Sequence, residues 1–226
     1  MDNSLFKAPS SALMAPTTHG INPQSILGEQ INWELAHRRR QLMETTGNSK
    51  IKYLLKPEIE RILDYAKDNR SKHFLINTLW HTGARISEAL ELTKKDFIFD
   101  EAGCFIKLIT LKQKKEQSRL VPVTDKRYID EARMMIGDLP KASNTKIWEI
   151  SRMAFNQYLN PVAKELGMAG INPHMLRHSF AINAILHLTP LPVLQAWMGH
   201  SKINSTAVYT EIFEPDTMAF MARISF

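Results

Sequence analysis

The sequence predicts an α+β fold that is mainly helical and contains one small antiparallel sheet. Three observations lead to this prediction. Apolar residues recur at helical spacing through most of residues 53–210, whereas residues 104–111 are rich in β-branched and aromatic side chains and residues 118–123 form a second short extended run. In addition, 44% of the residues are hydrophobic, which is typical of a globular chain that buries a core.

The first 50 residues are expected to lie outside the main fold. Residues 1–30 contain Pro, Ser, Thr and Gly without a period, which is typical of a mobile arm. Residues 29–45 fit a short helix, and its basic run is either a solvated face or a contact to phosphates. We assign the arm to residues 1–50, the folded domain to 51–213 and a tail helix to 214–226. The basic run consists of Arg38, Arg39 and Arg40.

Proline and glycine mark three successive helices at the start of the folded domain. The segment KPEIERILDYAKDN has Pro57 in its first turn, acids just after it and apolar residues on one face. The segment KHFLINTLWHTG is a more buried helix that ends at Gly83, a residue suited to a left-handed cap. The segment ISEALELTKKDF is predicted to form the third helix after this break. Arg85 is therefore expected just beyond one helix end, at the start of the next.

A β-hairpin with a charged tip follows. The runs CFIKLITL and SRLVPV read as two short strands, and KQKKEQ connects them. Pro122 places the second strand at the edge of the sheet or marks its end, because proline cannot donate to a ladder. Further helices are expected at about 125–136, 149–166, 174–188 and 190–199, with short pieces around 203–210 and 214–223.

Charge and cysteine usage limit the class of protein. A net charge of +6 and a pI near 9.4 suggest an acidic partner such as nucleic acid, although a basic surface also serves solubility. The one cysteine, Cys104, excludes an internal disulfide and a cysteine-based zinc site, and fits a reducing cytoplasm. No apolar run approaches the roughly 18 residues of a membrane span, and no secretion signal is recognisable at the N-terminus.

Several cationic and aromatic groups stand in apolar surroundings without matching acids. Two arginines can bind the two non-bridging oxygens of a phosphodiester, and donors placed there stabilise its transition state. Such a site needs no metal, and the sequence shows no cluster of Asp and Glu of the kind that holds Mg²⁺. The candidates are Arg85, His174, Arg177, His200 and Tyr209, with Lys112, Lys114 and Lys115 at the hairpin tip and Glu88 close to Arg85.

Each candidate also has an ordinary structural interpretation. His174 and His178 are four residues apart, as in a zinc site, but no third ligand is evident. We interpret His178 as a structural residue and His187 as a partner of the helix dipole. Tyr209 alone would be a half-buried helix tyrosine, and the hairpin lysines alone would be a solvated turn.

Five segments follow one another in a characteristic order. They are TGARISEALEL (82–92), TLKQKKEQSRLVPV (110–123), HMLRHSF (174–180), WMGH (197–200) and STAVYTEIF (205–213). Together they resemble the catalytic domain of the tyrosine recombinases, the phage integrase family. The resemblance covers about residues 53–213, and the final tyrosine follows the last histidine by nine residues, as in that family.

The resemblance implies a role for each residue. Arg85 and Arg177 would clamp the scissile phosphate, His200 would donate to it, and His174 would assist proton transfer from the tyrosine. Tyr209 would be the nucleophile that forms a 3′-phosphotyrosyl link, with no ATP and no cofactor. Lys112 would protonate the leaving 5′-oxygen, with Lys114 as the alternative, and Glu88 would support Arg85. The DNA contacts would come from Lys114, Lys115, Arg119, Arg38, Arg39 and Arg40.

The implied function is site-specific recombination of double-stranded DNA by integration, excision, inversion or resolution. The alternatives are relaxation of the type IB topoisomerase kind and DNA-binding regulation without cleavage. The resemblance also implies a tetramer on DNA held by the C-terminal tail, DNA-bending accessory proteins, and a cytoplasmic, nucleoid-associated location in a prokaryote. The family's helical core-binding domain is expected to be absent, reduced to one helix, or missing only from this sequence, since about 50 residues precede Tyr53.

Overall fold

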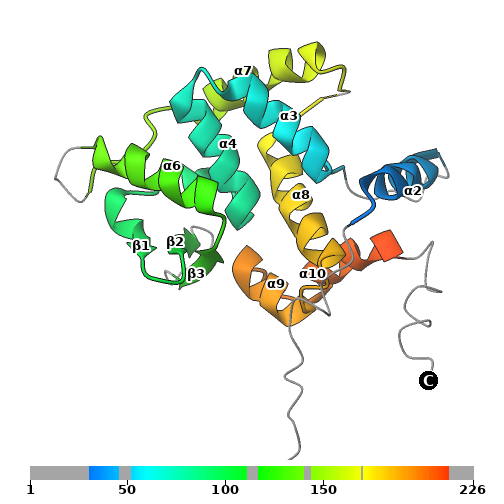
Figure 1. The fold of residues 1–226 in the computed structure, drawn as a ribbon. Helices are drawn as coiled ribbons and strands as arrows, with labels where there is room; N and C mark the ends of the chain where they lie inside the picture. Colours follow the sequence, from blue (N-terminus) through cyan, green and yellow to red (C-terminus); the bar gives the residue numbers. More distant parts are fainter. Residues whose placement is uncertain (1–30, 46–51, 111–116, 140–143, 169, 214–226) are drawn as a thin grey trace, which may run out of the picture. The chain divides into compact units, whose positions relative to one another are not determined.

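The computed structural model describes residues 31–45, 52–110, 117–139, 144–168 and 170–213. These residues form a mainly helical fold with one three-stranded antiparallel sheet, which confirms the predicted fold class (Figure 1). The helices are α2 (Trp33–Thr45), α3 (Lys56–Ala66), α4 (Arg70–Thr82), α5 (Ile86–Ala89), α6 (Lys126–Gly137), α7 (Arg152–Glu165), α8 (Pro173–Leu186), α9 (Leu191–Met198) and α10 (Asn204–Ala207). The remaining elements are the 3-10 helices η1 (Lys94–Asp96) and η2 (Val208–Phe213) and the strands β1 (Phe97–Phe99), β2 (Cys104–Thr110) and β3 (Gln117–Val123).

The sheet contains the predicted hairpin and one strand more. Strands β2 and β3 pair antiparallel with Phe105 opposite Pro122, and the strand order β1-β2-β3 leaves β3 at an edge. Pro122 therefore lies on an edge strand, as expected from its missing N–H group. The helix expected across residues 86–97 ends at Ala89 instead. Thr93 donates its backbone N–H and its hydroxyl to Asp96, a local arrangement that competes with helix, and the chain then enters β1.

The main core lies where helices α4 and α6 meet the sheet. Phe74 of α4 is fully buried, and its ring stacks on Tyr128 of α6 with centroids 5.6 Å apart. The indole of Trp148 lies 5.3 Å from the same ring, and Ile106 of β2 belongs to this core. Helix α8 reaches the core through Leu176, which makes it the element shared with the second cluster described next.

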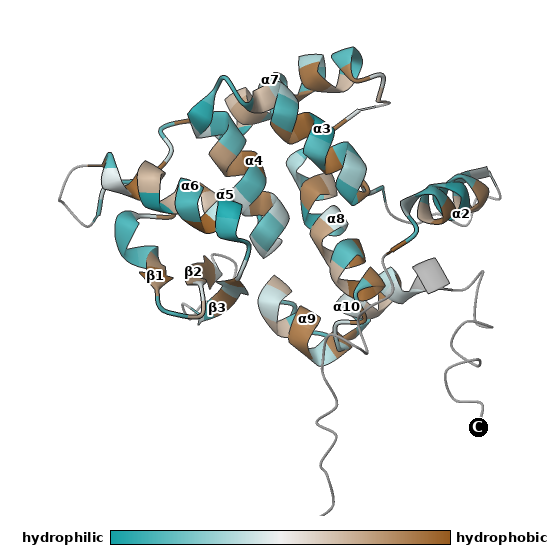
Figure 2. Ribbon diagram, in the orientation of Figure 1, coloured by the Kyte–Doolittle hydropathy of each residue, from teal (hydrophilic) through white to brown (hydrophobic). Residues whose placement is uncertain are grey.

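A second hydrophobic cluster joins the later part of α8 to α9, η2 and α2. It contains Ala36, Ala181, Leu194 and Tyr209, all buried. The expected N-terminal helix is present, and it begins at Trp33. Figure 2 shows α2 mostly in hydrophilic colours and α9 mostly in hydrophobic ones, so α2 contributes only one narrow face to the cluster. Helices of the described ranges include none long and apolar enough to cross a membrane.

Candidate active site

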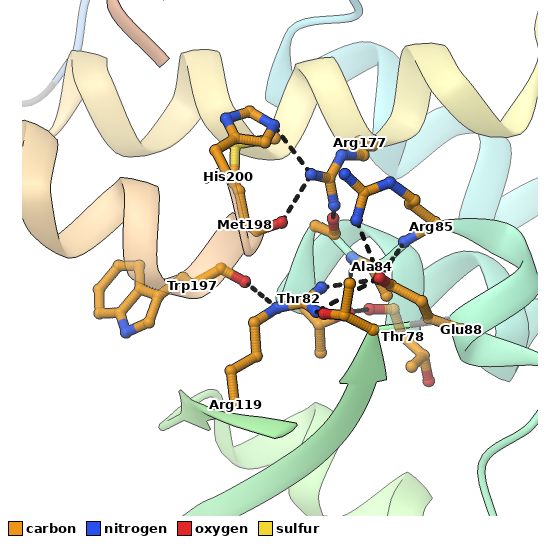
Figure 3. A network of polar contacts seen from close by, with 12 residues as sticks. Thr78, Thr82, Ala84, Arg85, Glu88, Arg119, Arg177, Trp197, Met198 and His200 are labelled. Carbon is orange, nitrogen blue, oxygen red and sulfur yellow. Dashed lines mark hydrogen bonds and ion pairs between the residues drawn. The ribbon is translucent and has the colours of Figure 1, made fainter. Parts of the chain in front are cut away.

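The site is assembled from helix ends. Helix α4 ends at Gly83 in the left-handed conformation (φ 59°), and the next helix, α5, begins with Arg85 as its N-cap. A Cβ on Gly83 would lie 2.3 Å from the ring of Phe180, so the close approach of α8 also requires glycine here. This break turns the chain so that Arg85 and the Gly83 carbonyl both face α8, as Figure 3 shows for Arg85 beside Arg177.

A buried carboxylate, Glu88, holds two arginines from different parts of the chain. Its side chain is 1% exposed, and its oxygens lie 2.9 Å from Arg85 Nη1 and 2.7 Å from Arg119 Nη2. It also accepts the backbone N–H of Arg85 at 2.9 Å. Burial alone would raise the pKa of Glu88, but the hydrogen bond and charge of Arg119, together with Arg85, outweigh it and lower that pKa. Glu88 is therefore ionised at neutral pH and fixes Arg85.

Arg119 is held within the site by several protein contacts, while its contact with DNA stays a prediction. Its side chain is only 10% exposed. Besides Glu88, it donates from Nε to the carbonyl of Trp197 at 2.6 Å and from Nη1 to Thr110 Oγ1 at 3.1 Å. Its guanidinium lies under Gly199, where an added Cβ would meet Arg119 Nη1 at 2.9 Å. Arg119 thus connects the hairpin to α5 and to the end of α9 (Figure 3).

The buried arginine of the site is Arg177, in the second turn of α8, with 2% of its surface exposed. Its Nη1 donates to the carbonyl of Gly83, and its Nη2 donates to the carbonyl of Met198 at 2.7 Å. No ion pair joins it to a carboxylate of the described residues. Burial, followed by the positive charge of Arg85, lowers the pKa of Arg177 to about 10, so it remains a cation at neutral pH. A buried cation held mainly by neutral acceptors is suited to receive an anionic ligand.

His200 follows the left-handed end of α9 and contacts Arg177 directly. Its Nε2 lies 2.9 Å from Arg177 Nη2, and its Nδ1 lies 2.9 Å from Thr206 Oγ1. Because arginine only donates, Nε2 must accept, and the ring is neutral with its proton on Nδ1. Burial and the charges of Arg177 and Arg85 lower the pKa of His200 to about 4, which agrees with this assignment. Thr206 was not singled out from the sequence, and its position three residues before Tyr209 was the only signal available.

Tyr209 is 2% exposed, and its hydroxyl contacts a histidine that the sequence interpretation set aside. Tyr209 Oη lies 2.9 Å from His178 Nδ1, so His178 belongs to the site and is not only structural. Burial raises the pKa of the Tyr209 hydroxyl, and the charges of Arg177 and Arg85 offset part of that increase. The signal that pointed to His178 was its place directly after Arg177, four residues beyond His174. The exposed His174 lies beside it, with ring centroids 4.4 Å apart.

The remaining predicted cations divide into three groups. Lys112, Lys114 and Lys115 lie outside the described residues, between Thr110 and Gln117, which line a cavity of about 170 Å³ together with His200. Arg38 is exposed and pairs with Glu34, and Arg39 is half-buried. Arg40 is buried and forms two hydrogen bonds to Glu58, at 2.6 and 2.8 Å, so its guanidinium is already bound within the protein. Within the described ranges, no three His, Cys, Asp or Glu side chains group as a metal site would require.

The structure therefore brings together two arginines, a neutral histidine and a buried tyrosine, the set that the tyrosine recombinase motifs of the sequence predicted. Residues 52–214 match the family model described as the phage integrase family. A resolvase of Escherichia coli (strain K12) is 32% identical over 92% of this chain and 89% of its own length, and another Escherichia coli resolvase is 35% identical over 74% and 76%. The crystal structure of the XerH recombinase bound to its difH substrate, in a post-cleavage complex, superposes with a TM-score of 0.63 at 23% identity, over 79% of this chain and 54% of that chain.

The chain belongs to the phage integrase family. The comparisons confirm the family, the catalytic-domain fold and the class of enzyme, a site-specific DNA recombinase, that the sequence motifs predicted. None of them favours relaxation or regulation without cleavage.

Proposed function

We propose that Tyr209 cuts one strand of a DNA recombination site by attacking the scissile phosphate, leaving a 3′-phosphotyrosyl link and a free 5′-hydroxyl. A 5′-hydroxyl from a second strand then attacks the link and reseals the DNA. Because the link conserves the bond energy, neither step needs ATP or a cofactor. The observation that carries the proposal is the contact of buried Arg177 with His200, in a site where the charges of Arg177 and Arg85 also act on Tyr209.

The two arginines are proposed to bind the non-bridging oxygens of the phosphate. In the described part of the chain, the three hydrogen bonds of Arg177 use three of the five N–H donors of a guanidinium. The other two remain for a phosphate, and Arg85, held by Glu88, supplies a second fork from the neighbouring helix end. Charge that concentrates on the oxygens in the transition state is stabilised by these fixed donors.

His200 and a hairpin lysine complete the proposed chemistry. His200 donates to the phosphate from Nε2 once a proton occupies that nitrogen, which the negative charge of the phosphate favours. Lys112, or Lys114 in its place, protonates the leaving 5′-oxygen. The strands that flank residues 111–116 end at Thr110 and Gln117 beside His200, and this supports delivery of a lysine to the site. His174, exposed at the start of α8, assists proton transfer as the neighbour of His178, with the two ring centroids 4.4 Å apart.

A covalent adduct is the direct test of this function. Nicked duplexes with a randomised segment release a short strand after cleavage, so the enzyme is trapped on DNA and the captured sequences identify the site. The adduct should form with the unaltered chain and be abolished by Tyr209→Phe. Tyr158→Phe, on α7, is the matched control and should form the adduct normally. Arg177→Lys keeps the charge but loses the fork, and should reduce adduct formation far more than binding. Absence of any adduct across the library would contradict the proposal.

Among the possible outcomes of recombination, we propose resolution of two sites in one DNA molecule. Two relatives that align with most of this chain are named resolvases, and this supports the choice of resolution. A supercoiled plasmid with two directly repeated sites should yield two smaller circles, whereas relaxation without new circles would favour the topoisomerase-like alternative. The proposed assembly is a tetramer on DNA that is held together through residues 214–226. That tail lies outside the described residues. We also propose that DNA-bending accessory proteins take part and that the protein acts on the nucleoid in the cytoplasm.

A further inference from the structure

The hydroxyl of Tyr209 is held by His178. Tyr209 Oη and His178 Nδ1 are 2.9 Å apart, and the two rings lie with centroids 5.6 Å apart. His178 is the only hydrogen-bond partner of this hydroxyl within the described ranges. Tyr209 is 2% exposed, so solvent has little access to the phenol, and a proton that leaves it needs a protein acceptor.

The protonation states give this hydrogen bond a direction. Burial, with the nearby charges of His174 and Arg177, lowers the pKa of His178 to about 4, so the imidazole is neutral at neutral pH. Burial raises the pKa of Tyr209, so the phenol keeps its proton. A neutral imidazole with its proton on Nε2 offers the Nδ1 lone pair, and the phenol donates to it. This geometry lies within the distance at which a general base works.

We propose that His178 is a catalytic residue that positions Tyr209 and accepts its proton during strand cleavage, an inference that rests on Tyr209 being the nucleophile. The proton passes from Tyr209 Oη to His178 Nδ1 as the bond from Oη to phosphorus forms and the bond from phosphorus to the 5′-oxygen breaks. The leaving 5′-oxygen takes its proton from the hairpin lysine. In the resealing step, the hairpin lysine takes up the proton of the attacking 5′-hydroxyl as the bond from its oxygen to phosphorus forms, and the His178 imidazolium returns its proton to Tyr209 Oη as the phosphotyrosyl bond breaks.

Substrate binding strengthens this base. His178 directly follows Arg177, and the positive charge of Arg177 is one of the causes that lower its basicity. A phosphate bound to Arg177 offsets that charge, so His178 gains affinity for a proton when a scissile phosphate is present. The Tyr209 hydroxyl therefore keeps its proton in the absence of substrate and transfers it to His178 when a scissile phosphate is bound. His174, whose ring lies against His178, adds to the same field.

Removal of the base should slow cleavage without affecting DNA binding. His178→Asn keeps a hydrogen-bond acceptor for the tyrosine but cannot take a proton, and His178→Gln serves if the first variant does not fold. Single-turnover adduct formation should fall about 10²–10⁴-fold. The matched control is His187→Asn, which changes a histidine at the other end of α8 and should cleave at the unaltered rate. Adduct formation by His178→Asn or His178→Gln at the unaltered rate would overturn the inference.

A more acidic tyrosine separates a proton acceptor from a structural role. Replacing Tyr209 with 3,5-difluorotyrosine makes the hydroxyl easier to ionise. In the His178→Asn background, this replacement should therefore raise the rate of adduct formation at least about 10-fold. If 3,5-difluorotyrosine does not raise the cleavage rate of His178→Asn, or raises that of His174→Asn instead, the assignment of His178 is overturned. If the unaltered chain forms no adduct, the proposed function fails. If the unaltered chain forms the adduct, the proposed function stands, and the rate of adduct formation by His178→Asn then tests the inference alone. A reduced rate supports the role of His178, and an unaltered rate overturns it.

Discussion

Replacing Glu88 with glutamine should destabilise the protein strongly, because this carboxylate compensates two poorly solvated cations. Glu88 is 1% exposed and pairs with Arg85, whose side chain is 27% exposed, and with Arg119, which is 10% exposed. Removing one partner of a buried pair costs about 3–5 kcal/mol. Arg85 can gain some hydration, and glutamine keeps one oxygen as an acceptor, so we expect a loss near the lower limit, about 3 kcal/mol.

Urea unfolding followed by circular dichroism measures this loss. With a denaturant slope of about 2–3 kcal/mol/M, the midpoint of Glu88→Gln should fall by about 1–1.5 M. Glu91→Gln is the matched control, since Glu91 pairs with Lys146 and both side chains are 50% exposed. Its free energy of unfolding should change by less than about 1 kcal/mol. Equal midpoints for the two variants would refute the argument that Glu88 compensates buried cations.

Three further predictions follow from the described contacts. Arg40→Met should lower the free energy of unfolding by about 3 kcal/mol with unchanged DNA affinity in gel-shift titrations, whereas Arg38→Ala should change stability by less than about 0.5 kcal/mol. Gly83→Ala should lower the free energy of unfolding by about 1–3 kcal/mol in denaturant titrations, because a residue with a side chain is strained at the φ of 59° that Gly83 adopts. The folded pKa values of His178 and His200 are about 4, below the ordinary 6.5, so the unfolded chain takes up protons first as the pH falls. Stability should therefore be complete above pH 6.5 and decline toward pH 4, and replacing both histidines with asparagine should flatten that decline in thermal melts; an equally steep decline would contradict it.

Local signals predicted most of the helices and the position of one key residue. Pro57 and Gly83 carry backbone preferences that act within a few residues, so the bounds of α3 and α4 followed closely from the sequence. The break at Gly83 also placed Arg85 correctly at the start of the next helix. The helix expected after it was too long, because the contact between Thr93 and Asp96 competes with helix and β1 then finds its partner in β2.

Contacts between distant segments could not be predicted in the same way. Arg119 reads as one more cation beside a basic hairpin, and only the fold brings it to Glu88 and to the Trp197 carbonyl. Arg40 likewise looks like part of a basic run until α3 presents Glu58 to it. His178 was separated from the chemistry because its partner, Tyr209, lies 31 positions later in the chain. In each case the deciding interaction depends on tertiary packing, which a linear pattern does not contain.

The bond between Tyr209 and DNA tests the central claim most directly. Protease and nuclease digestion of the trapped adduct, followed by tandem mass spectrometry, identifies both the modified residue and the end of the DNA strand attached to it. We predict a nucleotide joined through its 3′-phosphate to Tyr209 alone, with a free 5′-hydroxyl on the released strand. A nucleotide on another residue, or a link through a 5′-phosphate, would contradict the account of this site.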